Sequence, residues 1–300
     1  MGVFCWSFSE IVVRFLKAGP YSVGVVGPIS LSFYRFFFGG LILLAILGFR
    51  KSLRGVGQIF RNSPGLLVLS SVIGLGISNM IYFLGLQLTQ ANVGAALYTS
   101  YTLFIGVYSI FILNERTNIP LKITGFVIGF IGTIVLLTTF DFTLLVQPDK
   151  IIGNLLLVLA GAIWGFYSVL GKKIMRRNAE IKNVDVKFTI LSFFLACIPI
   201  AITLPLTSEA GDFFQHSAPE WLFIAIMALF VTAIGIYLFF MGVKLIDVSH
   251  GISFSLLKPI IATAFAFLLL GELPPVAMVV SVPLVTVAVL LINKKPKKKE

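Results

Sequence analysis

The sequence predicts an all-α membrane protein with ten transmembrane helices in two inverted five-helix repeats. Hydrophobic residues make up 58% of the 300-residue chain and charged residues only 12%, whereas soluble domains are about half apolar and about a quarter charged. Apolar runs of about 20 residues, long enough to cross a bilayer as a helix, recur along the whole chain. An internal repeat of five spans indicates the inverted arrangement. The runs lack the alternating pattern of barrel strands, so helices must satisfy the backbone in lipid.

The ten expected spans are separated by short connections that leave no room for a soluble domain. Prolines lie at or near the start of several spans, where a missing amide costs no helical hydrogen bond. The expected boundaries are 2–18, 29–49, 66–87, 92–114, 120–139, 151–174, 186–206, 220–243, 249–271 and 274–293. We assign residues 1–142 to the first repeat, 150–293 to the second, and 294–300 to a basic cytoplasmic tail.

The repeat becomes visible when Glu115 is placed on Glu272, an offset of 157 residues. This alignment places Gly85 on Gly242. Since each half has an odd number of spans, the second half must enter the membrane in the opposite orientation. Inverted repeats of this kind are the plan of many secondary transporters, whose substrate sites lie near the midplane between the halves.

The same repeat predicts a short first helix. A shift of one residue places Trp6 on Trp164. Thirteen residues from Ile151 onward precede Trp164, but only five precede Trp6. We therefore expect either a truncated start or a first helix that is about two turns shorter than its counterpart.

The distribution of basic residues predicts the orientation. If the N-terminus is cytoplasmic, the inner connections and the tail hold 18 of the Lys and Arg residues, the outer connections hold 3, and 2 lie within spans. Basic residues concentrate on the cytoplasmic side of membrane proteins. We expect a multi-pass protein of the cell membrane with both termini in the cytoplasm and the basic tail on anionic headgroups.

Several other classes of function are disfavoured by the composition. Cys5 and Cys197 fall in apolar spans without metal-like spacing, and His216 and His250 are too far apart for a zinc site. The net charge of +11 comes from residues at the ends of spans, which argues against nucleic-acid binding. No span contains a GxSxG or HExxH motif. We expect no enzyme activity, no metal and no cofactor.

The combined pattern resembles the drug/metabolite transporter (DMT) superfamily, EamA type. The resemblance rests on a Trp in the first helix of each half, on Tyr34-Arg35-Phe36, and on fourth helices that end in Asn114-Glu115 and Gly271-Glu272. It implies export or exchange of small metabolites by alternating access, in a cavity lined by helices one, three, four, six, eight and nine. Relatives carry amino acids, other metabolites, nucleotide sugars and phosphorylated sugars, so the resemblance leaves the substrate open. The Pro often seen in the first fourth helix is absent: Thr102 aligns with Pro259.

Lys258 is the sharpest candidate for substrate binding. Span nine begins near Gly251, and a rise of about 1.5 Å per residue places Lys258 roughly 10 Å inside the membrane. A charge at that depth marks a functional site by default. Pro259 frees a nearby carbonyl. We expect Lys258 to bind a carboxylate or phosphate; the alternative is that it pairs with a buried acid or extends to the interface. The resemblance supports binding, because related branches use a lysine in the ninth helix.

Glu10 on span one and Arg35 on span two are a second candidate pair, because both are expected at the same depth in the membrane. We favour a structural ion pair between them over a role of Glu10 in proton coupling.

Aromatic and polar side chains of several spans are expected to line the cavity. Span four carries an aromatic stripe, for which plain helix packing is the alternative. The expected lining residues are Asn79, Tyr82, Tyr98, Tyr101, Trp164, Tyr167, Tyr237 and Ser255.

Glu115 and Glu272 end equivalent helices at opposite membrane faces. We expect each to hold the tight turn and to accept from the amides of the following helix, with a gate role as the alternative. The small residues Gly125, Gly129 and Gly132 predict close helix packing, within a monomer or between the protomers of a homodimer.

These observations favour a secondary transporter that exports or exchanges a small metabolite, such as an amino acid or organic anion, across the cytoplasmic membrane. Drug efflux and the flipping of anionic lipids are alternatives within transport. A channel-like or structural membrane protein is the alternative of another class.

Overall fold

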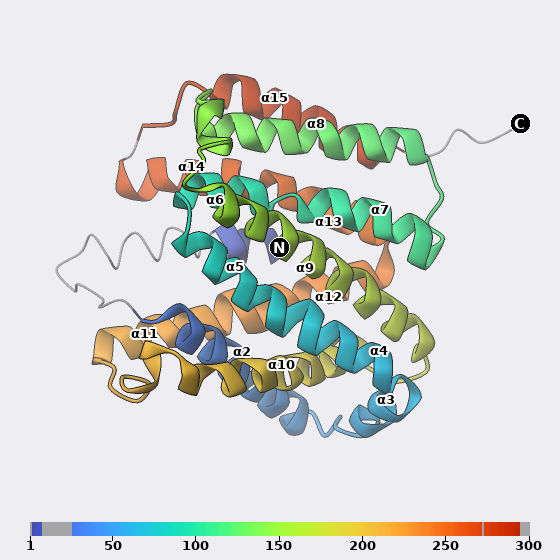
Figure 1. Cartoon of the computed structure of the whole chain (residues 1–300). Coiled ribbons are helices and arrows are strands. Elements are labelled where there is room, and N and C mark those ends of the chain that lie inside the picture. The colour runs from blue at the N-terminus through green and yellow to red at the C-terminus, as the bar shows by residue number, and fades with distance from the viewer. Residues whose placement is uncertain (1, 8–25, 272, 295–300) are drawn as a thin grey trace, which may run out of the picture.

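The computed structural model describes residues 2–7, 26–271 and 273–294, and within them the chain folds into a bundle of helices. Figure 1 shows the long helices side by side between the two ends of the molecule. The helices are α2 (Pro28–Phe49), α3 (Val56–Asn62), α4 (Pro64–Val68), α5 (Ser78–Gln87), α6 (Ala91–Tyr98), α7 (Tyr101–Leu113), α8 (Ile119–Thr138), α9 (Ile151–Arg177), α10 (Val184–Thr203), α11 (Ala218–Ile226), α12 (Gly235–Leu245), α13 (Val248–Ser253), α14 (Lys258–Leu270) and α15 (Met278–Ile292).

Eight helical spans in the described residues are long and apolar enough to cross a membrane. They are Pro28–Phe49, Pro64–Gln87, Val93–Leu113, Ile119–Thr138, Ile151–Arg177, Val184–Leu206, Ala218–Leu245 and Val248–Leu269. A ninth apolar helix, Met278–Ile292, is shorter and begins four residues later than the sequence predicts. Residues 2–7 are helical, but most of the predicted first span lies outside the described residues. The all-α membrane class is therefore confirmed.

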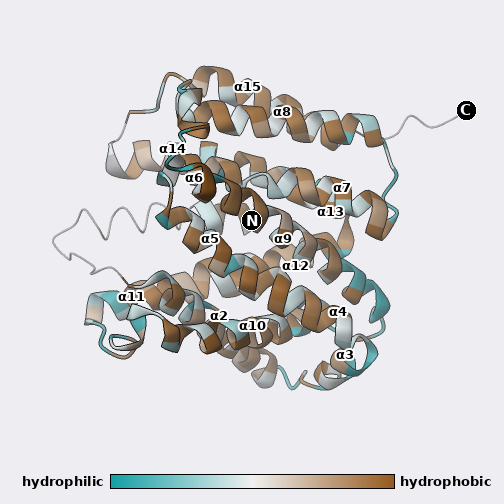
Figure 2. Ribbon diagram, viewed as in Figure 1, coloured by the Kyte–Doolittle hydropathy of each residue, from teal (hydrophilic) through white to brown (hydrophobic). Residues whose placement is uncertain are grey.

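The surface of the bundle suits a lipid environment. Figure 2 shows hydrophobic residues along the helices and hydrophilic residues at the connections. Large apolar side chains remain exposed on the outer faces of the helices; Phe111, for example, is 77% exposed. Exposed apolar area on this scale would be a liability in water, and it indicates the surface that faces the bilayer.

Helices at equivalent positions of the two halves pack against each other in antiparallel fashion. Cys197, late in α10, lies 4.0 Å from the carbonyl oxygen of Phe33, early in α2. At the other end of this pair, Asn183 donates to Ser52 at 3.2 Å. Similarly, Gly125 early in α8 lies against Ile292 late in α15. Equivalent helices that run in opposite directions are what an inverted repeat requires.

Two spans contain a π-helical segment at the same place in each half. One is Leu69–Ile77, between α4 and α5, and the other is Met227–Ile234, between α11 and α12. At the repeat offset the first segment aligns with residues 226–234. Such segments are rare and are frequently found at functional sites. Hydrophobic periodicity does not reveal them, because they change the backbone hydrogen bonds and leave the apolar character unchanged.

The close contact between α8 and α15 at Gly125 can be tested by substitution. A Cβ atom at Gly125 would lie 2.9 Å from the carbonyl oxygen of Ala288 and 2.6 Å from Ile292 Cγ1. We expect Gly125→Ala to lower the free energy of unfolding by about 1–3 kcal/mol, the usual cost of overpacking. Thermal unfolding in detergent measures the loss.

The matched control is Gly48→Ala in α2, where a Cβ atom would meet nothing within 4 Å. Alanine favours the helix over glycine, so this variant should be at least as stable as the original protein. Equal losses in the two variants would contradict the packing role of Gly125.

Candidate functional site

Spans four and nine are both interrupted along their length, at the same register. In the first half, α6 ends at Tyr98 and α7 begins at Tyr101. In the second half, α13 is followed by a 3-10 turn over Phe254–Leu257, and α14 begins at Lys258. Tyr101 and Lys258 align in the repeat, so each is the first residue of the second helical segment. Interrupted helices beside a cavity are typical of transporter binding sites.

Hydroxyl side chains and one proline explain these interruptions. Thr99 Oγ1 donates to the carbonyl of Ala96 at 2.6 Å, and Thr102 Oγ1 donates to that of Thr99 at 2.9 Å. In the second half, Ser255 Oγ donates to the carbonyl of Ile252 at 2.6 Å. Local bonds of this kind compete with helical ones. Pro259, at the start of α14, has no amide to donate.

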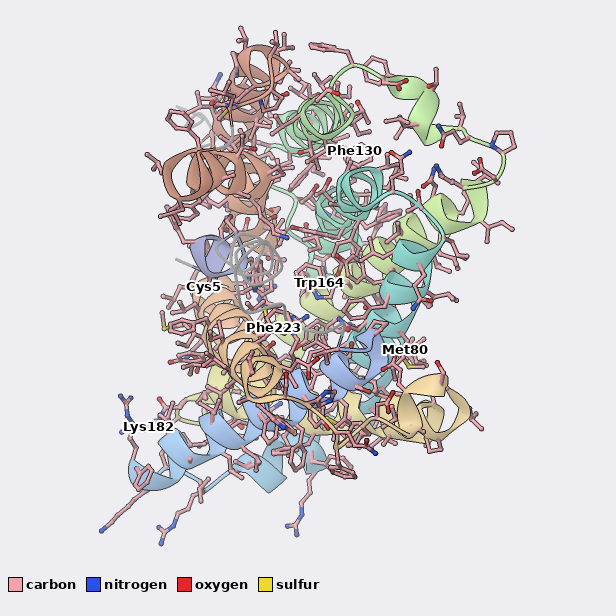
Figure 3. The ribbon with its side chains drawn as sticks, turned by 90° about the vertical axis from the view of Figure 1, so that its left-hand side faces the viewer. Cys5, Met80, Phe130, Trp164, Lys182 and Phe223 are labelled. Atoms are coloured by element: carbon pink, nitrogen blue, oxygen red, sulfur yellow. The ribbon has the colours of Figure 1, made fainter. Side chains whose placement is uncertain are left out.

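A row of aromatic rings runs from the break in span four across the bundle. The ring centroids of Tyr82 and Tyr98 are 4.5 Å apart, those of Tyr98 and Tyr101 5.3 Å, and those of Tyr101 and Trp164 4.8 Å. Trp164 continues the row to Phe239 at 5.8 Å. Figure 3 shows Trp164 near the centre of the bundle. Four of the predicted lining residues therefore lie together.

Span one joins this row. The rings of Trp6 and Trp164 are 6.1 Å apart, and Trp6 Nε1 donates to the carbonyl of Val231 at 3.1 Å. The next residue, Ser7, donates through Oγ to the carbonyl of Lys258 at 3.1 Å. The break that ends at Lys258 thus lies beside the aromatic row, and the Lys258 side chain is half-buried.

Polar groups of spans two, three and eight form further hydrogen bonds near the row. Arg35 Nε donates to Thr232 Oγ1 in the second π segment at 3.0 Å. Ser32 Oγ donates to Asn79 Oδ1 at 2.8 Å. The charge of Arg35 also interacts with Tyr82 and Tyr98. The predicted partner of Arg35, Glu10, lies outside the described residues.

Three predicted lining residues lie elsewhere. Tyr167 is fully buried between Phe188 and Phe240, at 6.0 and 5.3 Å between ring centroids. Its neighbours on α10 and α12 make it a packing residue. Ser255 is buried and bonds to its own helix, as described above.

Tyr237 is the third of these residues. It is half-buried in the first turn of α12, packs against the core and lies two residues before Phe239 of the row. Tyr167 and Tyr237 share α9 and α12 with Trp164 and Phe239 of the row, so the sequence alone does not separate them from the residues that meet there.

A buried ion-pair network joins the two halves at one end of the bundle. Glu115 Oε1 lies 3.0 Å from Lys172 Nζ and 3.3 Å from Arg176 Nη2. The same oxygen accepts from the amide of Val248, the first residue of α13, at 3.3 Å. Asn114, just before it, has a left-handed backbone with φ of 57°.

The expected cap on the following helix is therefore wrong for Glu115. No side chain caps α8, whereas Glu115 caps α13 in the other half. The physical reason is the left-handed turn at Asn114, after which Glu115 lies against α9 and α13. Glu272, its equivalent, lies outside the described residues.

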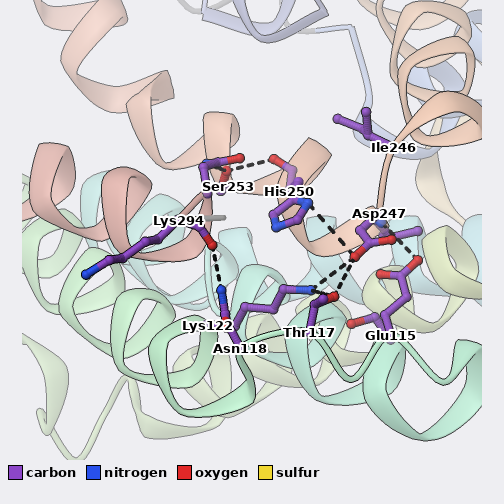
Figure 4. Close-up of polar contacts among 12 residues, drawn as sticks. Glu115, Thr117, Asn118, Lys122, Ile246, Asp247, His250, Ser253 and Lys294 are labelled. Atoms are coloured by element: carbon purple, nitrogen blue, oxygen red, sulfur yellow. Dashed lines mark hydrogen bonds and ion pairs between the residues drawn. The ribbon is translucent and has the colours of Figure 1, made fainter. Parts of the chain in front are cut away.

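The network continues through Asp247, as Figure 4 shows. Its Oδ2 lies 3.2 Å from the Nζ atom of the buried Lys122 and accepts from Thr117 Oγ1 at 3.2 Å. Burial raises the pKa of the Asp247 carboxyl, but the hydrogen bond from Lys122 and the charges of Lys122 and Lys172 outweigh burial and hold the pKa below its ordinary value. Lys172 also donates to the carbonyl of Ile246 at 2.5 Å. These contacts hold α7, α8, α9 and α13 together.

Two open hollows lie at opposite ends of the bundle, away from the aromatic row. One, of about 350 Å³, is lined by Glu209, Asp212 and neighbours in the acidic connection. The other, of about 300 Å³, lies between the α2–α3 and α9–α10 connections. In the described residues no group of three or more His, Cys, Asp or Glu side chains is placed to hold a metal ion.

Apolar membrane-length helices, antiparallel repeat-related pairs and a matched pair of interrupted helices define a multi-pass membrane protein of the inverted-repeat class. The chain belongs to the EamA-like transporter family, whose sequence pattern matches residues 1–138 and 151–294. This confirms the DMT superfamily and a transporter as the general class.

Named relatives cover most of the chain. An uncharacterized transporter, YyaM of Bacillus subtilis (strain 168), is 24% identical over 87% of this chain and 83% of its own length. The aromatic amino acid exporter YddG of Ancylobacter novellus is 26% identical over 83% of this chain and 81% of its own length. A solved crystal structure matches with a TM-score of 0.76 and 21% identity, covering 97% of this chain and 94% of that chain. That likeness shows the fold.

Proposed function

We propose that this transporter exports or exchanges an amino acid or a small organic anion by alternating access across the cytoplasmic membrane. The observation that carries the proposal is the meeting of a cation, an aromatic row and two interrupted helices. Lys258 begins the second segment of span nine, and its backbone bonds to Ser7, the neighbour of Trp6 in the row. A carboxylate bound at Lys258 would place the rest of the molecule against the rings.

The chemistry of the row favours a substrate with an apolar or aromatic body. Tyr82, Tyr98, Tyr101 and Trp164 offer ring faces and edges, with the centroids of successive rings 4.5 to 5.3 Å apart. Aromatic pairs at such spacing contribute about 0.5–1.5 kcal/mol each beyond area burial. Arg35, which bonds to Thr232, supplies a second positive charge for an anionic group. The aromatic amino acid exporter among the relatives supports the same class of substrate.

The ion-pair network at Glu115 supports a gate at one end of the bundle. It joins α7 of the first half to α9 and α13 of the second, so opening that end requires Glu115 to part from Lys172 or Val248. Rocking of one half against the other around a central site is the usual form of alternating access. The basic connections at the same end support its assignment to the cytoplasm, with both termini on that side.

Counterflow in proteoliposomes tests the proposal. Vesicles are loaded with unlabelled L-phenylalanine, L-tryptophan, L-alanine or an aromatic carboxylate, and labelled compound is added outside. We expect transient accumulation of label for aromatic amino acids or carboxylates, because a carrier exchanges one substrate molecule for another. Empty vesicles of the same lipid are the control. Equal flux with and without internal substrate would identify a channel and overturn the proposal.

A further inference from the structure

A basic pocket of about 300 Å³ lies at the end of the bundle where α2 and α9 end. One wall is formed by residues 51–58, in the connection from α2 and the start of α3. The other wall is formed by residues 180–187, in the connection from α9 and the start of α10. The charged side chains that line it are Lys51, Arg54, Lys182, Lys187 and the single acid Glu180. Four cations against one carboxylate leave a strongly positive site.

The pocket is a built feature, because several bonds fix its two walls to each other. Asn183 Nδ2 donates to Ser52 Oγ at 3.2 Å, and Asn62 Nδ2 donates to Asn178 Oδ1 at 2.8 Å. Gly55 has φ of 92°, and a Cβ atom there would lie 3.0 Å from Ile181. The chain turn at Gly55 therefore brings the two walls close together.

Lys187 places a buried ammonium group in this pocket. Its side chain belongs to the first turns of α10 and is only 2% exposed. Nζ donates to the carbonyl of Arg54 at 2.6 Å. Within the described residues Lys187 forms no ion pair, unlike the buried Lys122 and Lys172. An ammonium group has three donors, and burying one without an anion is costly.

We propose that this pocket binds a phosphate group, carried by an anionic lipid or by soluble phosphate. The charge of a phosphate matches the excess of cations, and Lys and Arg side chains form short, strong bonds with its oxygens. The pocket also lies just beyond Phe49 and just before Val184, the ends of two apolar spans. Lipid phosphates lie at that depth, and basic pockets between helices are known sites for them. This site is separate from the transport site proposed above.

Binding is tested on the full chain in detergent, in two arms. Native mass spectrometry measures retention of phosphatidylglycerol against phosphatidylcholine, and calorimetric titration measures binding of inorganic phosphate. We expect Lys51→Gln and Arg54→Gln each to weaken binding by about fivefold, the usual effect of one basic residue near an anionic surface. Both side chains are exposed, so these variants keep the fold. Glu180→Gln should tighten binding, because it removes the one opposing charge.

Arg177→Gln is the matched control. Arg177 is exposed at the same end of the bundle but does not line the pocket. Retention of phosphatidylglycerol that falls in the pocket variants and not in the control supports a lipid site. The same pattern with inorganic phosphate supports a soluble ligand. Binding of neither ligand, or equal weakening by Arg177→Gln, overturns the proposal whatever the result of the counterflow assay.

Discussion

Lys258→Ala is expected to weaken the apparent affinity for an anionic substrate in counterflow by about 10- to 100-fold. A hydrogen bond to a charged group contributes about 1.5–3 kcal/mol, and the variant removes that bond from the proposed site. Lys258 is half-buried at the start of α14. Expression and thermal unfolding are measured beside transport, so that a loss of substrate affinity is distinguished from a loss of folded protein.

Two further variants sharpen this experiment. Lys258→Arg keeps the charge and should retain part of the affinity, because a guanidinium also binds a carboxylate. Lys173→Ala removes a half-exposed lysine from α9, away from the aromatic row, and should transport normally. If Lys258→Ala, expressed at the original level, transports every substrate of the panel at the original rate, Lys258 does not bind substrate.

Glu115→Leu is expected to cost about 3–5 kcal/mol of stability, because it leaves the buried Lys172 ammonium without its carboxylate. It also removes the acceptor of the Val248 amide at the start of α13. Chemical or thermal unfolding in detergent measures the loss. The double variant Glu115→Leu with Lys172→Met should lose less than the single variant, since the only charge left without this carboxylate is that of the half-exposed Arg176.

Arg176→Gln separates the buried pair from its exposed neighbour. The Arg176 side chain is 47% exposed, and exposed ion pairs contribute at most about 1 kcal/mol. We therefore expect a small change in stability from this variant. If Glu115→Leu proves as mild as Arg176→Gln, the network does not hold the two halves together.

The spans were predictable because hydrophobic runs report burial in lipid directly. Nine of the ten expected spans have a counterpart, and several begin or end within two residues of the prediction, as α2 does at Pro28–Phe49. The repeat was visible because single residues such as Glu115 and Glu272 align. The meeting of Tyr82, Tyr98, Tyr101 and Trp164 also followed from spans expected to line one cavity.

What was missed depends on how individual groups bond in three dimensions. Lys122 and Lys172 counted as basic residues at inner span ends, yet both are buried with carboxylates from distant segments. The concentration of basic residues on the cytoplasmic side predicts the orientation of the chain, but it contains no information about the partner of each basic residue. The π segments and the positions of the breaks depend on which carbonyl oxygen accepts the hydrogen bond of each amide or hydroxyl group. The hydropathy of the residues does not determine these hydrogen bonds.

The antiparallel pairs α2 with α10 and α8 with α15 suggest how such a chain arose. Each pair joins equivalent helices, so in an ancestor made of one five-helix unit these would be self-contacts across a twofold axis. Such an ancestor is a homodimer with one subunit inserted in each direction. Because the two subunits have the same sequence, any substitution near the twofold axis would change both equivalent helices at once. In one continuous chain the two interrupted helices can differ, so that one carries Tyr101 where its equivalent carries Lys258.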